Sequence, residues 1–321
     1  MNFLSKIKFK INLLYKLLYE INDSLQKLHK ELQQTQEIKK ALSRVQEAIG
    51  RIENLQLQAG ENEHTTIQHY EFRVFSQWGE DGIIQFLLRH LEVPRKIFVE
   101  FGVYNYTESN TRFLLVNNNW SGLVIDSSAE NISYIKKDPI YWQHNLKAVY
   151  AFVTKDNINN IISENGIEGE IGLLSIDIDG NDYWVWQAIN TIQPAIVIIE
   201  YNFRFGKTKA VTVPYDENFE RSNAHHSTLY YGASLKAIYL LAQQKGYVFI
   251  GCNSAGNNAF FVRKDLKPNW IRELTVEEGY VAGQFRESRD EKGELIYLSA
   301  QEEQKILSTL PLVEVEPHLS S

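Results

Sequence analysis

Cysteine is almost absent from this sequence of 321 residues, which contains only Cys252. A single cysteine excludes an intrachain disulfide and a zinc site built from cysteines, and it predicts a reducing, cytoplasmic environment. Basic residues are in the minority, because 33 Lys and Arg stand against 40 Asp and Glu, for a net charge of -7. Such a chain lacks the basic footprint that binds phosphate backbones, so we do not expect a nucleic-acid partner.

Long apolar runs are also missing. No stretch of about 18 consecutive apolar residues occurs, so we expect no membrane-spanning helix. The first residues do not have the pattern of a signal peptide, because lysines interrupt the apolar positions and no small-residue cleavage site follows.

Residues 4–57 contain no proline and have apolar residues at alternating steps of four and three, from Ile7 to Ile52. This is the 3.5-residue period of a coiled-coil seam. Near Thr35 two steps of three follow each other, a stammer that overwinds a supercoil locally. We therefore expect residues 1–59 to form an amphipathic coiled-coil helix. It can pair with a copy of itself, with another protein or with its own domain, and self-association into a homo-oligomer is the favoured prediction.

Residues 1–19 contain four lysines and no acidic residue. A basic amphipathic helix of this kind can lie on an anionic surface, so peripheral contact with the inner face of the cytoplasmic membrane is one interpretation. The alternative is an ordinary solvated helix face.

After a polar linker at 60–69, residues 70–263 alternate strand and helix patterns, and we expect 264–321 to be peripheral. Five strands separated by helical segments predict an α/β fold with a parallel sheet covered by helices on both faces. The expected strands lie at 97–101, 122–126, 147–152, 171–177, 195–201, 247–252 and 258–263.

Acidic residues end several of these strands. Glu100, Asp177 and Glu200 would meet at one edge of the sheet, where an unpaired buried carboxylate is costly without a ligand. Gly102 would let the backbone approach a ligand closely, and Asp126 would lie where an acid binds ribose hydroxyls. The pattern indicates a nucleoside-bearing cofactor.

Oxygen ligands are dense just after the fourth strand. Asp177, with Glu200 and Asn202 from the neighbouring strand end, could bind Mg²⁺ or a similar hard cation, whereas Asp179 or Asn181 could simply cap the next helix. The long segment 202–230 has little regular pattern and is interpreted as a substrate lid. It carries His225 and His226, either of which could act as a general base or be an ordinary solvated histidine.

These residues resemble a known family. Phe98-Val99-Glu100-Phe101-Gly102, then Asp126, then Ser175-Ile176-Asp177 are similar to class I S-adenosylmethionine-dependent methyltransferases, above all to FkbM-type and related O-methyltransferases of sugars and natural products. The resemblance implies a Rossmann-like sheet of seven strands with the last one antiparallel. It also implies S-adenosylmethionine (SAM) as cofactor, with contacts from Gln77, Glu100, Gly102, Glu108, Asn110, Asp126, Ala151 and Phe152.

The activity expected from the resemblance is O-methyl transfer to a hydroxyl of a sugar, a glycan such as a surface polysaccharide, or a related natural product. Asp177, Glu200 and Asn202 look like the metal triad of catechol-type and macrolide-tailoring enzymes, whose lysine base is replaced here by Gly180. Asp177, His225 and His226 are thus the candidate catalytic residues. Two alternatives remain: a metal-dependent hydroxylase- or hydrolase-like enzyme on the same fold, and a non-catalytic coiled-coil assembly protein.

Overall fold

The computed structural model describes residues 3–58, 66–284 and 287–316, with side chains described from residue 14 onward. The chain divides into two compact units, Met1–Arg51 and Ile52–Ser321. Among the described residues, no helix is both long enough and apolar enough to cross a bilayer.

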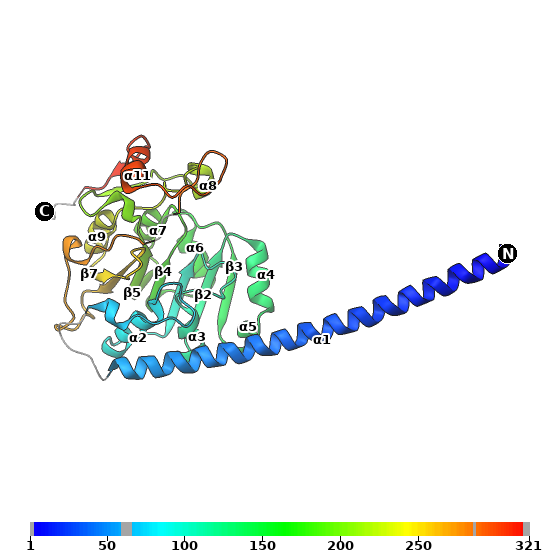
Figure 1. The fold of residues 1–321 in the computed structure, drawn as a ribbon. Helices are drawn as coiled ribbons and strands as arrows, with labels where there is room; N and C mark the ends of the chain where they lie inside the picture. The colour runs from blue at the N-terminus through cyan, green and yellow to red at the C-terminus, as the bar shows by residue number, and fades with distance from the viewer. Residues whose placement is uncertain (1–2, 59–65, 285–286, 317–321) are drawn as a thin grey trace. The chain divides into compact units, whose positions relative to one another are not determined.

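The first unit lies within α1 (Phe3–Gln58), one continuous helix that agrees with the helix predicted at 4–57 (Figure 1). The side chains of the basic stretch up to residue 13 lie outside the described residues, as do residues 60–65 of the predicted linker. The rest of that linker leads into η1 (Ile67–Tyr70), a 3-10 helix in which Ile67 and Tyr70 are buried. The domain therefore begins earlier than residue 70.

The second unit is built on a mixed sheet of seven strands in the order β3-β2-β1-β4-β5-β8-β7. Strands β1 to β5 are parallel, and β8 runs antiparallel to both β5 and β7. This order confirms the seven-stranded fold with one antiparallel strand that the resemblance implied. The strands are β1 (Ile97–Phe101), β2 (Ser121–Asp126), β3 (Leu146–Tyr150), β4 (Gly169–Ile176), β5 (Ile192–Glu200), β7 (Tyr247–Cys252) and β8 (Asn258–Arg263).

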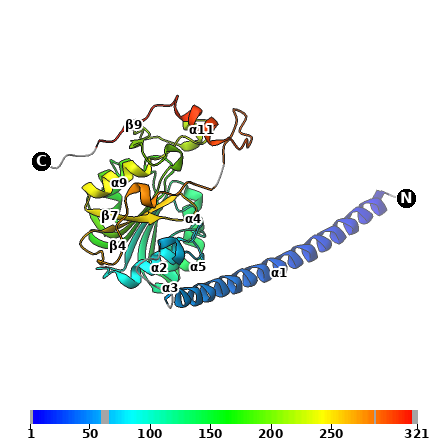
Figure 2. The same ribbon diagram turned by 60° about the vertical axis from the view of Figure 1, so that its left-hand side comes forward.

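Helices cover both faces of this sheet because successive strand residues point to opposite faces. In β1, for example, Phe98 packs in one hydrophobic cluster and Val99 in the other. The first face is covered by α2 (Glu80–His90), α3 (Arg112–Asn118), α4 (Ala129–Lys137) and α5 (Pro139–Gln143). The second face is covered by α6 (Ile158–Glu164), α7 (Asp182–Ala188), α9 (Leu235–Gln244) and α10 (Val276–Gly279), as Figure 2 shows for α9.

Because side chains alternate between the two faces along each strand, three of the acids at strand ends lie on the same face. Glu100, Asp126 and Glu200 are in phase with Phe98, Val124 and Ile198, whose side chains pack under α2, α3 and α4. The carboxyl ends of the parallel strands share one edge, so the alternation alone brings these acids to the same side of that edge.

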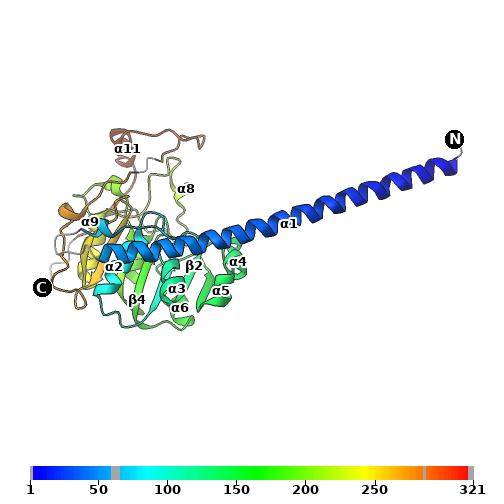
Figure 3. The same ribbon diagram turned by 60° about the horizontal axis from the view of Figure 1, so that its bottom comes forward.

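Residues 202–230 and 287–316 fold together, and we call this part of the domain the cap. It contains η2 (Phe203–Phe205), β6 (Val211–Thr212), α8 (Arg221–Ala224), α11 (Ala300–Leu307) and β9 (Val313–Glu314). Strand β6 pairs with β9, and Phe205, Val213 and Leu307 share a small core. Figures 1 and 3 show α8 and α11 together, at the opposite end of the domain from α5.

The cap bears on two expectations. Segment 202–230, interpreted as a substrate lid, has apolar residues buried against the C-terminal part of the chain, and its Phe219 and Arg221 line the cavity described below. The part after residue 263, predicted to be peripheral, contributes the buried side chains of Ile271, Val276 and Leu307.

Candidate functional site

A cavity of about 650 Å³ lies at the carboxyl ends of β1, β2, β4 and β5. This volume is in the range of pockets that hold small-molecule ligands. All eight residues that the resemblance implied as cofactor contacts line it: Gln77, Glu100, Gly102, Glu108, Asn110, Asp126, Ala151 and Phe152.

The turn after β1 depends on Gly102. Its φ of 72° is in the left-handed region, and a Cβ added there would lie 1.6 Å from the carbonyl oxygen of Asp177. The Gly102 N–H donates to the carbonyl oxygen of Ile125, which fixes the turn against β2. Glycine is therefore required here both for the backbone conformation and for the close approach of two chain segments.

Asp126 forms the side of the cavity at the end of β2. Its Oδ1 accepts hydrogen bonds from the Ser128 N–H (2.9 Å) and the Asn131 side-chain amide (3.0 Å). Its Oδ2 accepts from the Tyr104 N–H at 2.8 Å. An ionised carboxylate can accept about four hydrogen bonds, so Asp126 keeps acceptor capacity for a ligand hydroxyl while its orientation is fixed.

Glu100 lines the cavity and also holds a neighbouring loop. Its Oε1 accepts from the Asn110 N–H (2.9 Å), and its Oε2 accepts from the N–H and hydroxyl of Thr111. Burial raises the pKa of Glu100, although these hydrogen bonds favour the ionised form and partly offset the rise. Both carboxylate oxygens thus hold the loop before α3, and this places the side chain of Asn110 in the cavity wall.

Three carboxylates gather at the end of the cavity beside β4 and β5. Asp177, Asp179 and Glu200 each offer an oxygen, and these oxygens lie within 4.8 Å of one another. Within 66–284 and 287–316, the buried Glu200 Oε2 has no hydrogen-bond partner. Burial raises the pKa of Asp177 and of Glu200 well above the ordinary values, and repulsion from the neighbouring carboxylates adds to the rise.

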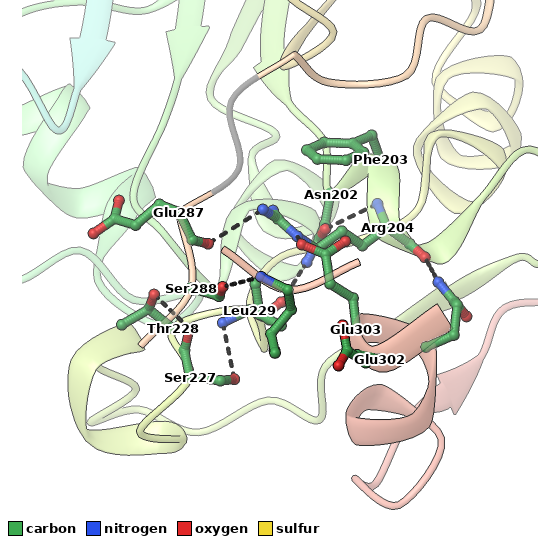
Figure 4. Close-up of polar contacts among 12 residues, drawn as sticks. Asn202, Phe203, Arg204, Ser227, Thr228, Leu229, Glu287, Ser288, Glu302 and Glu303 are labelled. Atoms are coloured by element: carbon green, nitrogen blue, oxygen red, sulfur yellow. Dashed lines mark hydrogen bonds and ion pairs between the residues drawn. The ribbon is translucent and has the colours of Figure 1, made fainter. Parts of the chain in front are cut away.

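Asn202, the third member of the predicted triad, is not among the described residues that line the cavity, and its side chain makes hydrogen bonds elsewhere. Its side-chain amide donates to the carbonyl oxygens of Leu229 (2.9 Å) and Tyr231 (3.1 Å), and its Oδ1 accepts from the Arg204 N–H, as Figure 4 shows in part. These bonds tie the chain just after β5 to residues 204, 229 and 231. The third carboxylate beside Asp177 and Glu200 is that of Asp179.

His225 and His226 are also elsewhere. The described residues that line the cavity include neither histidine. The His225 Nδ1 shares a hydrogen bond of 2.8 Å with the Ser227 hydroxyl, and its ring lies 4.2 Å from that of His226. Burial lowers the pKa of His225, and the charge of His226 adds to this. The structure thus provides no contact between the predicted histidine base and the cavity, whereas Asp177 lines it.

Arg221 lines the cavity, although it was not among the candidate site residues. It extends from α8, pairs with Asp179, and donates from Nε to the Thr228 carbonyl oxygen at 2.8 Å. Its guanidinium lies 3.8 Å from the centre of the Tyr231 ring. The only available signal was its position within the lid segment, because its partner Asp179 is 42 residues away.

The cap reaches the cavity through three residues, Phe219, Arg221 and Glu287. Arg204 holds the two parts of the cap together: its Nε donates to Glu303 Oε1 at 3.0 Å and its Nη2 lies 3.4 Å from the Glu287 carbonyl oxygen (Figure 4). Arg204 is almost fully buried; its ion pair holds α11, and its contact with the Glu287 carbonyl oxygen holds the segment that carries Glu287.

No family model matches the chain. No curated protein matches it either. Among solved structures, the chain is similar to the N-terminal domain of EvdMO1 with SAH bound, at 9% identity, a TM-score of 0.37, and coverage of 57% of this chain and 79% of that one. It is similar to a putative caffeoyl-CoA O-methyltransferase from Staphylococcus aureus, at 12% identity, a TM-score of 0.37, and coverage of 57% and 82%.

A third similar structure is PKMT2 from Rickettsia typhi in complex with AdoHcy, at 8% identity, a TM-score of 0.39, and coverage of 63% and 56%. Scores this low do not bear on activity, so the fold is assigned from the strand order and directions of the sheet. The domain has the class I methyltransferase fold.

Proposed function

We propose that this chain is a SAM-dependent O-methyltransferase that acts on a hydroxyl of a sugar, a glycan or a related natural product. The observation that supports it is the convergence in one cavity of the Gly102 turn, the Asp126 carboxylate and the cluster of Asp177, Asp179 and Glu200. Fold alone does not decide activity, so the proposal depends on these residues.

The cavity suits SAM in shape and in charge. The Gly102 turn leaves no room for a side chain, and Asp126 keeps capacity to accept from ribose hydroxyls. Among the described residues that line the cavity, seven are carboxylic acids and one is basic, Arg221. A site with this excess of acid favours a cationic ligand, and SAM carries a sulfonium and an ammonium group. Ala151 and Phe152 would border the adenine.

SAM would supply an electrophilic methyl group on its sulfonium sulfur. The chain must then align the acceptor hydroxyl with that methyl group and receive the hydroxyl proton. We propose that the Asp177 carboxylate, which lines the cavity, receives that proton when it is not bound to a cation. Phe219 from the cap offers an apolar surface for one face of a sugar ring.

A divalent cation fits the acid cluster. Three carboxylates with one paired guanidinium leave an excess of negative charge, and Glu200 Oε2 is a buried oxygen without a partner in the described part of the chain. We propose that Asp177, Asp179 and Glu200 bind Mg²⁺ or a similar ion. Such an ion would lower the pKa of an acceptor hydroxyl.

Isothermal titration calorimetry of the full chain with SAM and with its demethylated product tests the cofactor. We expect both to bind, and Asp126→Asn to weaken binding about 10- to 100-fold, the loss of one or two charge-assisted hydrogen bonds. Glu130→Gln, an exposed acid on the following helix, is the matched control and should bind as the parent chain does. The same binding for Asp126→Asn and Glu130→Gln would contradict the assignment.

The same titrations separate the alternatives. Mg²⁺ binding without any SAM binding would favour a hydroxylase- or hydrolase-like enzyme. Absence of both, with function that depends only on α1, would favour a non-catalytic assembly protein. Repeating the SAM titration after EDTA treatment shows whether the cation contributes to cofactor binding, and transfer of a labelled methyl group to candidate glycans identifies the acceptor.

A further inference from the structure

An apolar stripe runs along α1 within the unit Met1–Arg51, and we call it the seam. Its side chains expose between 49% and 67% of their surface, which is unusual for ten large aliphatic residues on one helix face. Figure 3 shows α1 as an unbroken helix over this length. The seam consists of Leu14, Leu18, Ile21, Leu25, Leu28, Leu32, Ile38, Leu42, Val45 and Ile49.

We propose that α1 assembles with three further copies of itself into a parallel four-stranded coiled coil. This goes beyond the proposed enzymatic function and does not depend on it. The steps of four and three define the heptad without ambiguity, because a step from d to a spans four residues and a step from a to d spans three. Leu14 is therefore at a d position and Leu18 at an a position.

The residue types at these positions argue for more than two strands. Four of the five a positions are leucine: Leu18, Leu25, Leu32 and Leu42, with Ile49 as the fifth. Three of the five d positions are β-branched: Ile21, Ile38 and Val45. Two-stranded coils favour the reverse, with β-branched residues at a and leucine at d, whereas leucine at a with isoleucine at d favours larger bundles.

The positions beside the seam support the same conclusion. In a two-stranded coil the e and g positions are often Glu and Lys, which form ion pairs between the helices. Here only Glu31 and Lys39 are charged among the ten flanking residues: Tyr15, Leu17, Asn22, Ser24, His29, Glu31, Lys39, Ala41, Gln46 and Ala48. The charges lie instead on the outer face, where Lys27 and Asp23 form an ion pair at 2.8 Å. A wide face of low charge suits a bundle in which e and g are partly buried.

The stammer at Thr35 favours a second copy of the same chain as the partner. Each helix in a coiled coil must overwind at the level where its partner does, or the side chains no longer interlock. Parallel copies in register place Thr35 at the same level in all helices. An antiparallel arrangement of residues 14–49 would place the breaks at different levels, because Thr35 lies away from the middle of that segment.

Sedimentation equilibrium of the full chain tests the number of copies. We expect a mass of ~149 kDa, four times the 37.2 kDa of one chain. A mass near that of two chains would refute the four-stranded arrangement, and a monomer would refute self-association altogether. A variant that exchanges the two residue types should become a dimer. It combines Leu18→Ile, Leu25→Ile, Leu32→Ile and Leu42→Ile with Ile21→Leu, Ile38→Leu and Val45→Leu.

A second pair of variants separates loss of the seam from general damage to the helix. Leu25→Asp with Leu32→Asp places charges at two a positions and should produce monomers. Gln26→Asp with Gln33→Asp places the same charges, at the same spacing, on the outer face and should leave the assembly intact. Equal effects of the two variants would overturn the proposal, since the seam would then not be the interface.

Cross-linking tests the parallel orientation. The native Cys252 is buried, so a cysteine introduced by Leu14→Cys should dominate oxidation. In a parallel bundle the substituted positions are adjacent, and we expect a disulfide-linked pair of chains on a non-reducing gel. The outer-face variant Gln26→Cys should remain unlinked. Flotation of the full chain with phosphatidylglycerol vesicles in a density gradient tests the membrane alternative. A protein that is monomeric in solution but floats with the vesicles would overturn the proposal and assign the seam to a membrane surface.

Discussion

Gly102→Ala should destabilise the domain more than the same substitution at another glycine with a positive φ. Two costs add at Gly102. A positive φ costs a residue with a Cβ about 1 kcal/mol. The added Cβ would also lie 1.6 Å from the Asp177 carbonyl oxygen, which belongs to the backbone and cannot rotate away. Overpacking of this kind typically costs about 1–3 kcal/mol or more.

Gly246 provides the matched control. Its φ is 82°, and no atom of the described residues lies within 4 Å of a Cβ placed there. Gly246→Ala should therefore cost only the conformational part, about 1 kcal/mol. In a domain of this size 1 kcal/mol lowers Tm by roughly 2–4 °C, so a total cost of about 2–4 kcal/mol for Gly102→Ala should lower Tm by roughly 4–16 °C.

Thermal unfolding followed by circular dichroism measures both variants, and calorimetry with SAM measures the second consequence. To relieve the clash, Asp177 must move, and Asp177 lines the cavity. Gly102→Ala should therefore weaken SAM binding even at temperatures where the variant is fully folded, and Gly246→Ala should not. Equal Tm values for the two variants would refute the claim that the close approach of Gly102 and Asp177 shapes the site.

Three further predictions follow from buried polar groups. Asn202→Ala removes three side-chain hydrogen bonds, to Arg204, Leu229 and Tyr231, and should destabilise the domain by about 2–4 kcal/mol. Calorimetry should show an unchanged Mg²⁺ affinity, whereas a weaker affinity would mean that Asn202 is a metal ligand. Glu200→Gln removes a buried carboxylate with a raised pKa, so it should raise Tm at pH 8 when no divalent cation is present. The same variant should lose tight Mg²⁺ binding, and an unchanged Mg²⁺ affinity would exclude Glu200 as a ligand. Burial raises the pKa of Asp81 from 3.8 to about 6, so the folded state holds the proton more tightly and the stability from this group is lost as the pH rises from about 4 through 6. Asp81→Asn, which can still accept from the N–H groups of residues 74–76 through its amide oxygen, should remove up to about 3 kcal/mol of that pH dependence in urea unfolding curves.

Local patterns predicted the sheet well. Strands at 97–101, 247–252 and 258–263 match the observed β1, β7 and β8 to the residue, because buried β-branched and aromatic runs are bounded there by turn residues. The sequence also contains local signals for the starts of three helices that the predictions above do not include. Asp138 caps α5 with Pro139 at its first position, and the capping boxes of Thr275 with Glu278 and Ser299 with Glu302 begin α10 and α11.

The errors in the site come from contacts between distant parts of the chain. Asn202 is engaged by carbonyl groups 27 and 29 residues away, and no pattern near Asn202 indicates them. Arg221 finds Asp179 across 42 residues. The strand-end acids could be placed because periodicity in one strand decides their face, whereas the cap could not, since its core joins 202–230 to 287–316 only after folding.

Backbone strain is present at the edge of the sheet that borders the cavity. Of the six non-glycine residues with positive φ in the described part of the chain, three, Tyr104, Tyr106 and Asp179, lie in turns at the carboxyl ends of β1 or β4. The carboxyls of Asp177 and Glu200 meet at the same edge, with pKa values raised by burial and mutual repulsion. A sequence selected only for stability would replace these residues, because strained turns and clustered acids each cost free energy in the empty domain. Their coincidence with the cavity is therefore an argument for a ligand-binding edge that follows from this chain alone. The backbone N–H of Tyr104, in one of these strained turns, donates to Asp126 Oδ2, so the strained edge also orients the proposed ribose-binding carboxylate.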